Sequence, residues 1–573
     1  MSSSQIIVLA TPVFFLLIAF EFAWGRIKGR NTYQLDDAIN SISLGMLSQV
    51  SGVLTRLLRV GIYTAVYVSY PDWHDESFWT AWYGWPVALV FYDFCYYWKH
   101  RAGHECAVFW AAHVVHHQSQ SFNLSTALRQ TSSDALLGWI FFLPMAVAGV
   151  PPQVFAVVAL IDLLYQYWVH TDHIGKLGWF DRWFCSPSNH RVHHSVNMRY
   201  MDRNYGGILI IWDRLFGSFQ EEDGPCVYGT RSPLESWDPM WANAEVYWSL
   251  LKDSWHARNW FDKIRVWFKP PGWRPTDVAQ RFPKPAFEMA RITRYSPVIS
   301  RSNQLMASLH FLVLIGGVTA YLWLADSWPL STSAVWLAVL GIGLWCTGAI
   351  VQGRIRVREL LLLECAALAT ATGVLGLTEW HYAFKPLTLV IAMVLILFDP
   401  RAVDDSRQFK VFLLLALLAS LVGDVLLMLP GNFFIAGLAS FLVAHVYYLL
   451  LLQRRSSPPV WFPNRWALAA TLLTGAAMYV YLWPGLRGAL LASAVAVYVV
   501  LIALMAGQAI GRAIRLRNRA ATLVALGALS FMLSDSLLAV NRFMLPLPFA
   551  PLWVLATYYL AQILMARNLL KKA

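Results

Sequence analysis

Charged residues are scarce in this sequence of 573 residues. Asp, Glu, Lys and Arg make up 14% of it, against about a quarter in soluble domains. Hydrophobic residues make up 57%, and many apolar stretches approach the roughly 20 residues that a membrane-spanning helix needs. We therefore expect an all-α, polytopic integral membrane protein. The net charge of +12 does not indicate a nucleic-acid partner, because cytoplasmic loops of membrane proteins collect Lys and Arg.

Several familiar signatures are also missing. The six cysteines are scattered without a CxxC pair, so they predict no disulfide framework. The sequence contains no nucleotide-binding fingerprint and no haem motif, which is consistent with an external reductant for any redox reaction. Residues 1–22 lack a basic start and a small-residue cleavage site, so we interpret them as a first spanning helix rather than a signal peptide.

Histidine, by contrast, is concentrated, with ten of the fifteen histidines between His100 and His194. Eight of them form the clusters HRAGH (His100, His104), HVVHH (His113, His116, His117) and HRVHH (His190, His193, His194). Offsets of three and four residues place side chains on one helix face, so each cluster is expected to aim its imidazoles at one point. Eight donors exceed the four ligands of a structural zinc and suit two metal ions. Iron is favoured for O2 chemistry, since zinc has no redox activity.

Other residues near the clusters are candidates for the same site. His170 is predicted as a ninth ligand, while the role of its neighbour His173 stays open. Nearby carboxylates are expected to orient the ligands by hydrogen bonds, without binding the metal themselves. Glu105, directly after His104, is the favoured one. The other candidates are Asp93, Asp134, Asp162, Asp172 and Asp202. The alternative interpretation is a polar loop whose histidines merely titrate or bind adventitious metal, and three clusters within about one domain's length disfavour it.

These motifs carry a family resemblance. The three histidine clusters, with DRNYG (202–206) and WDRLFG (212–217), resemble the fatty acid hydroxylase/sterol desaturase superfamily of membrane di-iron enzymes. The longer stretches DFCYYWKHRAGHE (93–105), WAAHVVHHQSQSFNLSTALRQ (110–130), YQYWVHT (165–171) and SPSNHRVHH (186–194) resemble alkylglycerol monooxygenases over most of the first 300 residues. The resemblance implies that the eight clustered histidines and His170 bind two iron ions and that Glu105 is needed for activity.

The resemblance also implies a reaction. The ether-linked alkyl carbon of a glycerol ether lipid would be hydroxylated with O2, giving a hemiacetal that collapses to a fatty aldehyde and a glycerol. A tetrahydropterin would supply the electrons. The lack of a cofactor motif in the sequence is equally consistent with a ferredoxin or cytochrome partner. The alternatives are a sterol, fatty acyl or carotenoid hydroxylase or desaturase, and, outside enzymes, a metal sensor or transporter.

Charge patterning divides and orients the chain. Residues 1–250 form the expected di-iron domain, 251–304 a basic, aromatic segment at the membrane surface or a plain linker, 305–354 a spanning hairpin and 355–573 an eight-helix module. Basic residues follow the first helix at Arg26, Lys28 and Arg30, whereas the loop 72–76 is acidic. By the positive-inside rule the three histidine clusters then emerge on the cytoplasmic face. An apolar hairpin over 136–168, with its tip at Pro151 and Pro152, returns the chain to His170.

The eight-helix module contains ionisable residues where a membrane protein rarely has them. Asp424 and Asp535 lie within apolar helices, Lys385 begins another and His445 lies deeper, so all four are functional candidates. The motifs around Lys385, Asp424, His445, Asp535 and Gln562 resemble the lysoplasmalogenase family over about 355–570. The resemblance implies hydrolysis of a vinyl ether, which needs a general acid and a base. The alternative is a structural polar network in a catalytically silent membrane anchor.

Overall fold

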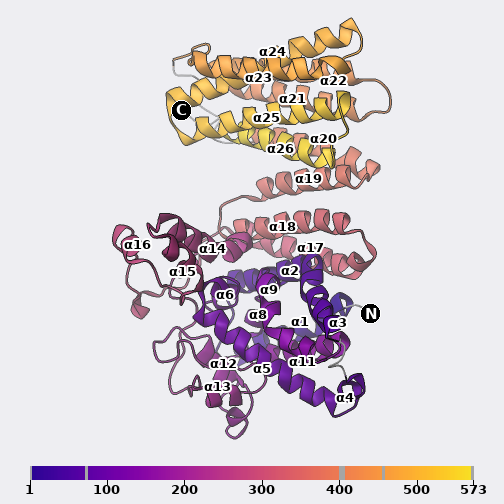
Figure 1. Ribbon diagram of the computed structural model, residues 1–573. Helices are drawn as coiled ribbons and strands as arrows, with labels where there is room; N and C mark the ends of the chain where they lie inside the picture. Colours follow the sequence, from indigo (N-terminus) through magenta and orange to yellow (C-terminus); the bar gives the residue numbers. More distant parts are fainter. Residues whose placement is uncertain (1–2, 71–74, 399–406, 455–457, 570–573) are drawn as a thin grey trace. The chain divides into compact units, whose positions relative to one another are not determined.

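The protein is described here by a computed structural model that covers residues 3–70, 75–398, 407–454 and 458–569. About 73% of the chain is helical, and no strand occurs in the described ranges. The predicted all-α class is therefore confirmed. The chain forms two compact units, Met1–Ile355 (unit 1) and Arg356–Ala573 (unit 2), each described below by itself (Figure 1). The predicted domain limits at residues 250 and 304 would divide unit 1 further, and they stay predictions.

Unit 1 combines long apolar helices with short helices that carry the histidines. Its longer helices are α1 (Ser3–Ile27), α2 (Leu35–Arg56), α5 (Gly84–Glu105), α11 (Pro152–Trp168), α14 (Pro239–His256), α17 (Arg301–Leu324) and α18 (Leu330–Val351). The shorter ones are α3 (Ile62–Ser69), α4 (Glu76–Thr80), α6 (Ala107–Ala111), α7 (Val114–His117), α8 (Leu124–Ala127), α9 (Asp134–Leu137), α10 (Leu143–Val147), α12 (Pro187–His193), α13 (Ile211–Phe216), α15 (Trp260–Phe268) and α16 (Thr276–Arg281). A π-helical turn at Leu57–Gly61 joins α2 to α3.

The predicted hairpins are present in unit 1. Helix α11 begins at Pro152, as a proline in the first helical turn favours, and ends just before His170. The arm before it is broken into α9, a 3-10 turn at Gly138–Phe142 and α10. Helices α17 and α18 form the second hairpin and pack with α2 around a core that includes Val50, Tyr321 and Leu344.

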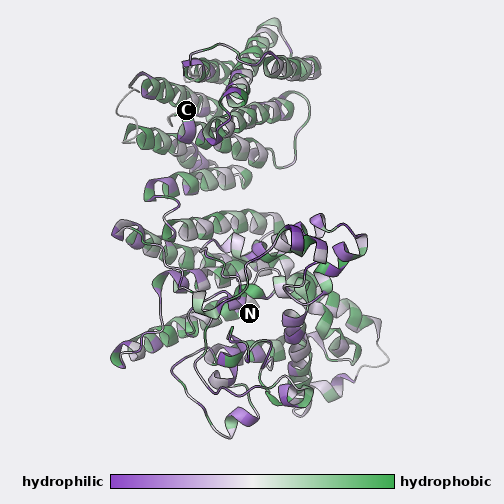
Figure 2. Ribbon diagram, turned by 90° about the vertical axis from the view of Figure 1, so that its left-hand side faces the viewer, coloured by the Kyte–Doolittle hydropathy of each residue, from purple (hydrophilic) through white to green (hydrophobic). Residues whose placement is uncertain are grey.

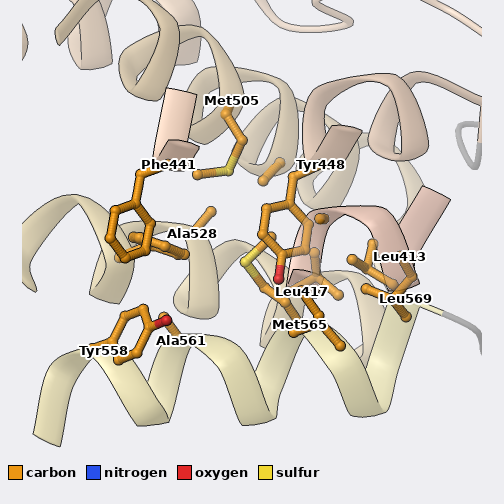
Figure 3. Close-up of a cluster of buried hydrophobic side chains, with 14 of the residues drawn as sticks. Leu413, Leu417, Phe441, Tyr448, Met505, Ala528, Tyr558, Ala561, Met565 and Leu569 are labelled. Atoms are coloured by element: carbon orange, nitrogen blue, oxygen red, sulfur yellow. The ribbon is translucent and has the colours of Figure 1, made fainter. Parts of the chain in front are cut away.

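Unit 2 contains eight long helices, as the sequence predicts. They are α19 (Val357–Val374), α20 (Thr378–Leu397), α21 (Arg407–Met428), α22 (Phe434–Arg454), α23 (Arg465–Leu482), α24 (Ala489–Leu516), α25 (Arg519–Phe543) and α26 (Ala550–Leu569). One buried apolar cluster joins most of them, and Figure 3 shows Phe441 and Tyr448 of α22 directed toward α26. Hydrophobic residues dominate these helices along their length (Figure 2).

Nine helices within the described ranges are long and apolar enough to cross a membrane. Three belong to unit 1 (Ser4–Ile27, Arg301–Ser327 and Leu330–Val351) and six to unit 2. The protein is therefore a multi-pass membrane protein, as predicted. Residues 71–74, which include much of the acidic loop used to orient the chain, lie outside the described ranges. The cytoplasmic position of the histidines accordingly stays a prediction.

Candidate metal centre

Unit 1 gathers all nine predicted histidine ligands into two groups. One group contains five imidazoles and the other four, and within each group the candidate ligand nitrogens lie within 4.8 Å of one another. The first is His100, His104, His113, His117 and His193, and the second is His116, His170, His190 and His194. The rings of His117 and His194, one from each group, stack at 4.4 Å, so the two groups are adjacent.

The histidine clusters are divided between the two groups, which the sequence argument did not anticipate. In HVVHH, His113 and His117 join the five-histidine group while His116 joins the four-histidine group. In HRVHH, His190 and His194 share one group and His193 belongs to the other. The expectation that each cluster aims at one point was therefore wrong for these two clusters. A helix turns by 100° per residue, so the residue three positions along diverges enough to face the neighbouring group.

Local sequence fixes where these short helices begin. The side chain of Ser186 accepts a hydrogen bond from the backbone N–H of Asn189, and Pro187 occupies the first turn of α12. A serine cap followed by proline is a strong helix start, and it sets the register of His190 and His193. Asn123 caps α8 in the same way, and α8 leads into the backbone at Arg129.

Backbone carbonyls orient four of the imidazoles. Their Nδ1 atoms lie 2.8–3.0 Å from a carbonyl oxygen: His100 from Tyr205, His116 from Arg129, His170 from Gln166 and His193 from Arg203. A carbonyl oxygen only accepts, so each Nδ1 donates and the lone pair is left on Nε2. The sequence argument expected carboxylates in this role and missed the carbonyls, which no residue type can signal.

The nitrogen positions fit a transition metal. Adjacent Nε2 atoms lie 3.0 Å apart between His117 and His113 and 3.1 Å apart between His170 and His116. Two imidazoles bound to one ion at about 2.1 Å and at right angles place their nitrogens about 3.0 Å apart. The buried Nε2 atoms of His104 and His193 find no hydrogen-bond partner in the described part of the chain. The donor set therefore suits two metal ions.

Burial keeps these rings in the form that a metal needs. It lowers the pKa of His116 to about 4 and holds the pKa of His113 and His194 well below the usual range. The same direction and main cause apply to the pKa of His100, His117, His170, His190 and His193. Neutral imidazole is the metal-binding form of histidine, so the site is prepared to bind cations rather than to hold protons.

Unit 2 brings the predicted polar residues into two buried clusters. In the first, Asp424 lies 3.2 Å from the Lys385 ammonium and accepts a hydrogen bond from the Tyr558 hydroxyl at 2.6 Å. In the second, the Tyr498 hydroxyl donates to Asp535, and His445 Nε2 lies 2.9 Å from the Tyr498 oxygen. Tyr558 belongs to the Tyr558–Tyr559 pair that shares in the lysoplasmalogenase resemblance, but it was given no role. Tyr498 was not predicted, because a lone tyrosine in an apolar helix carries no distinguishing pattern.

Comparison with known proteins gives the family. A zebrafish (Danio rerio) alkylglycerol monooxygenase is 34% identical over 372 residues, which are 63% of this chain and 80% of that protein. The Xenopus tropicalis alkylglycerol monooxygenase is 36% identical over 53% of this chain and 68% of its own length. The chain belongs to the alkylglycerol monooxygenase family. The human member is 40% identical over 46% of this chain, and the match spans 59% of the human protein.

Family models match both units. The fatty acid hydroxylase model matches residues 85–218, which contain every histidine of the two groups, and the YhhN family model matches residues 380–569. The chain is thus a fusion of an alkylglycerol monooxygenase-family region with a YhhN region. No solved structure matches the chain.

Two of the remaining candidates lie apart from the histidine groups in this family member. Glu105 is directed to the exposed side of α5, where its carboxylate pairs with Arg101 at 2.9 Å and is 47% exposed. His173 lies outside both groups, 3.5 Å from the Thr32 hydroxyl. Among the predicted carboxylates Asp202 comes nearest to the expected role, with Oδ1 at 3.5 Å from His104 Nδ1.

Because Glu105 lies on the exposed side of α5, we expect its replacement to have only a small effect on activity. An exposed i, i+4 ion pair contributes about 0.3–0.5 kcal/mol, so Glu105→Gln should leave the iron content unchanged and the oxidation rate within about twofold. The family resemblance implies the opposite, a loss of activity. Rate and metal content measured on the same preparation will decide between them, with Glu221→Gln, whose carboxylate pairs with Lys176 on the surface, as the matched control.

Asp213, in the WDRLFG motif, supports the metal centre from a distance. Its fully buried carboxylate accepts hydrogen bonds from the backbone N–H groups of Tyr205 and Gly206, both at 2.7 Å, and from the Ser218 hydroxyl. The Tyr205 carbonyl in turn holds His100. Asn204, in the left-handed region at φ 58°, closes the same loop through Asn189 and Gln220.

Asp213→Asn should therefore weaken metal binding without removing a ligand. The amide keeps one acceptor but loses the negative charge and half of the acceptor capacity, so the Tyr205 peptide loosens. Outer partners of metal ligands contribute about 10- to 100-fold in affinity, and we expect a loss in that range, measured by competition with a chelator. Asp223→Asn, on the exposed pair with Arg199, is the control, and equal affinity in both variants would contradict the role given to Asp213.

Proposed function

We propose that unit 1 is a di-iron monooxygenase that hydroxylates the ether-linked alkyl carbon of glycerol ether lipids, and that unit 2 hydrolyses the vinyl ether of lysoplasmalogens. The observation that supports the first activity most strongly is the pair of buried histidine groups with their Nδ1 atoms held by backbone carbonyls. The family membership supports the substrate class.

In this proposal the nine histidines hold two iron ions, which supply the activation of O2 when bound. Neutral imidazoles add no negative charge, so the bound ions keep their full positive charge and their affinity for oxygen ligands. Eight of the nine histidines are buried and His113 is half-buried, so bulk water has little access to either group. The hydroxylated ether carbon is a hemiacetal, and its collapse gives the fatty aldehyde and the glycerol.

A cavity of mixed polarity beside the five-histidine group is the proposed approach for the substrate. It encloses about 370 Å³ of empty space, part of it open to solvent, and its walls include His100 and His113 together with the ion pair of Lys99 and Asp134 at 2.9 Å. The pair offers both donors and acceptors, which suit the hydroxyl groups of a glycerol. Binding there would place the adjacent ether carbon next to the histidines.

The electrons are proposed to come from a tetrahydropterin in solution, and a protein electron donor is the alternative. The test is the purified chain in lipid vesicles with iron and O2, assayed on an alkylglycerol and on a sterol, each with and without tetrahydropterin. Fatty aldehyde from the alkylglycerol, dependent on the pterin, is expected. Oxidation of the sterol alone would favour a sterol hydroxylase, and metal binding without O2 consumption would favour a sensor or transporter.

The proposal for unit 2 is supported by the match to the YhhN family and by its two buried aspartate clusters. Vinyl-ether hydrolysis consumes water and no O2, so the assay is run on a lysoplasmalogen under anaerobic conditions, where unit 1 is silent. Release of aldehyde is expected. Its absence would make unit 2 a membrane anchor, with the polar clusters serving only to hold the helices.

The membrane surface is the proposed partner of residues 251–304. Trp255, Trp260, Phe261 and Phe268 are between 64% and 80% exposed, and Lys263 and Arg265 lie beside aromatic rings. Aromatic rings and basic residues together suit the headgroup layer of an anionic leaflet. We place this segment and the histidine site on the cytoplasmic face, as the basic residues after α1 favour.

A further inference from the structure

The two aspartate clusters of unit 2 differ in their access to a cavity. Residues of α21, α22, α23, α24 and α25 bound a cavity that encloses about 700 Å³ of empty space, part of it open to the surroundings. Its lining is mostly apolar, including Phe434, Leu438 and Met478, and the polar side chains of Tyr498, Asp535 and Ser536 reach it. Asp424 and Lys385 do not line it. An apolar cavity with a few convergent polar groups is a typical ligand site, and this one suits a single alkyl chain with one polar end.

In the described part of the chain, the polar contacts of Asp535 converge on one carboxyl oxygen. The Tyr498 hydroxyl donates to Oδ2 of Asp535, and His445 Nε2 lies 2.9 Å from the Tyr498 oxygen and 3.6 Å from the same Oδ2. A phenol has one proton, so a Tyr498 that donates to the carboxyl group accepts from a protonated Nε2 of His445. All of these contacts with Asp535 go to Oδ2, so Oδ1 is the oxygen available to carry the transferred proton.

Asp424 has the opposite surroundings. Its Oδ1 pairs with Lys385 and its Oδ2 accepts from Tyr558, so both oxygens are engaged and the negative charge is balanced. Its side chain is 3% exposed, against 19% for Asp535. The fully buried Phe531 ring lies 4.7 Å from the His445 ring and 5.5 Å from the Tyr558 ring, and so contacts both clusters. Asp424 is placed to hold α20, α21 and α26 together.

We propose that Asp535, and not Asp424, exchanges protons with the substrate in this cavity, and that Tyr498, backed by His445, is the positioning residue for its carboxyl group. The assignment rests on the proposed vinyl-ether hydrolysis. The sequence alone left the division of roles between the two aspartates open.

The reaction balances with water as the only co-reactant. The carboxyl proton of Asp535 passes to the outer vinyl carbon, where a C–H bond forms and the double bond is lost. Water adds to the carbon beside the ether oxygen and returns one proton to the Asp535 carboxylate. The hemiacetal then breaks its C–O bond as a proton moves to the glycerol oxygen, which gives a fatty aldehyde and the free hydroxyl. No electron acceptor is required.

The test compares matched variants of the full chain in lipid vesicles under anaerobic conditions. Asp535→Asn should lower kcat for lysoplasmalogen by about 10²- to 10⁴-fold, the usual contribution of a general acid or base. Inhibition by a saturated ether lysolipid, which binds without reacting, should be unchanged. Tyr498→Phe should lower kcat by about tenfold or more and alter its pH profile, with little change in KM.

Tyr448→Phe is the matched control for Tyr498→Phe. Its side chain is also buried and its hydroxyl donates to Gln562 at 2.6 Å, but the residue does not line the cavity. We expect its kcat and pH profile to match the unsubstituted protein. A Tyr498→Phe profile that also matches would reject the positioning role.

The outcomes separate this assignment from the proposed function. Loss of turnover in Asp535→Asn, with inhibitor binding kept, supports both. Full turnover in Asp535→Asn, or loss of turnover in a folded Asp424→Asn variant that still binds the inhibitor, would overturn the assignment while hydrolysis itself stands. Absence of turnover in the unsubstituted protein would reject the hydrolysis and the assignment together.

Discussion

Replacing His190 with alanine is expected to reduce the metal content of the purified protein from two ions to one and to abolish oxidation of the glycerol ether. His190 Nε2 lies 3.0 Å from His170 Nε2 and 3.1 Å from His194 Nε2, at the middle of the four-histidine group. Its loss leaves three ligands. Residues that hydrogen-bond to a metal ligand already contribute about 10- to 100-fold to metal affinity or activity. Removing a ligand itself should therefore lower the rate by more than 100-fold. Metal analysis and product formation are measured on one preparation.

His173→Ala is the matched control for this prediction. His173 lies three residues beyond His170 but outside both groups, and its Nε2 lies 3.5 Å from the Thr32 hydroxyl. We expect two metal ions and an unchanged rate. Two retained ions in His190→Ala, or loss of metal in His173→Ala, would contradict the ligand set. The substitution His193→Ala should remove the other ion, because His193 belongs to the five-histidine group.

The gathering of the candidate histidines was predictable from the sequence, but their arrangement was not. Clustered histidines at offsets of three and four are visible in the chain, and all nine predicted ligands meet in unit 1. The division of HVVHH and HRVHH between two groups depends on how short helices of four and seven residues are set against each other. The orienting groups are backbone carbonyls, such as that of Tyr205. Any residue type can present a carbonyl, so only the fold reveals them.

The helices of unit 2 were predictable because long apolar stretches specify membrane helices. The sequence predicts eight helices in this module, and eight are observed, from α19 to α26. The lateral pairing of those helices is not encoded in such patterns, because apolar faces are similar all round. Tyr558 contacts Asp424 from a helix far along the chain, and Tyr498 contacts Asp535 from the preceding helix. Both contacts became apparent only in the structure.

Breaking the buried pair of Lys385 and Asp424 is expected to destabilise unit 2 strongly, whereas removing both charges is not. Lys385→Met leaves an uncompensated carboxylate, and Asp424→Asn leaves an uncompensated ammonium, each inside apolar helices. Loss of one partner of a buried pair costs about 3–5 kcal/mol. The double variant removes both charges, and neutral replacements of buried pairs are often tolerated. We therefore expect it to recover most of the stability, measured by thermal unfolding in detergent.

The exposed pair in the same unit supplies the control. Arg567 lies 3.6 Å from Glu359, with Arg567 50% exposed, so Arg567→Met should change stability by less than about 1 kcal/mol. The rate of lysoplasmalogen hydrolysis by the double variant then distinguishes a structural role of the pair from a catalytic one. If Asp424 serves only to hold the helices, the stable double variant should still turn over lysoplasmalogen through Asp535. A stable but inactive double variant would show that the Lys385 and Asp424 pair takes part in the chemistry.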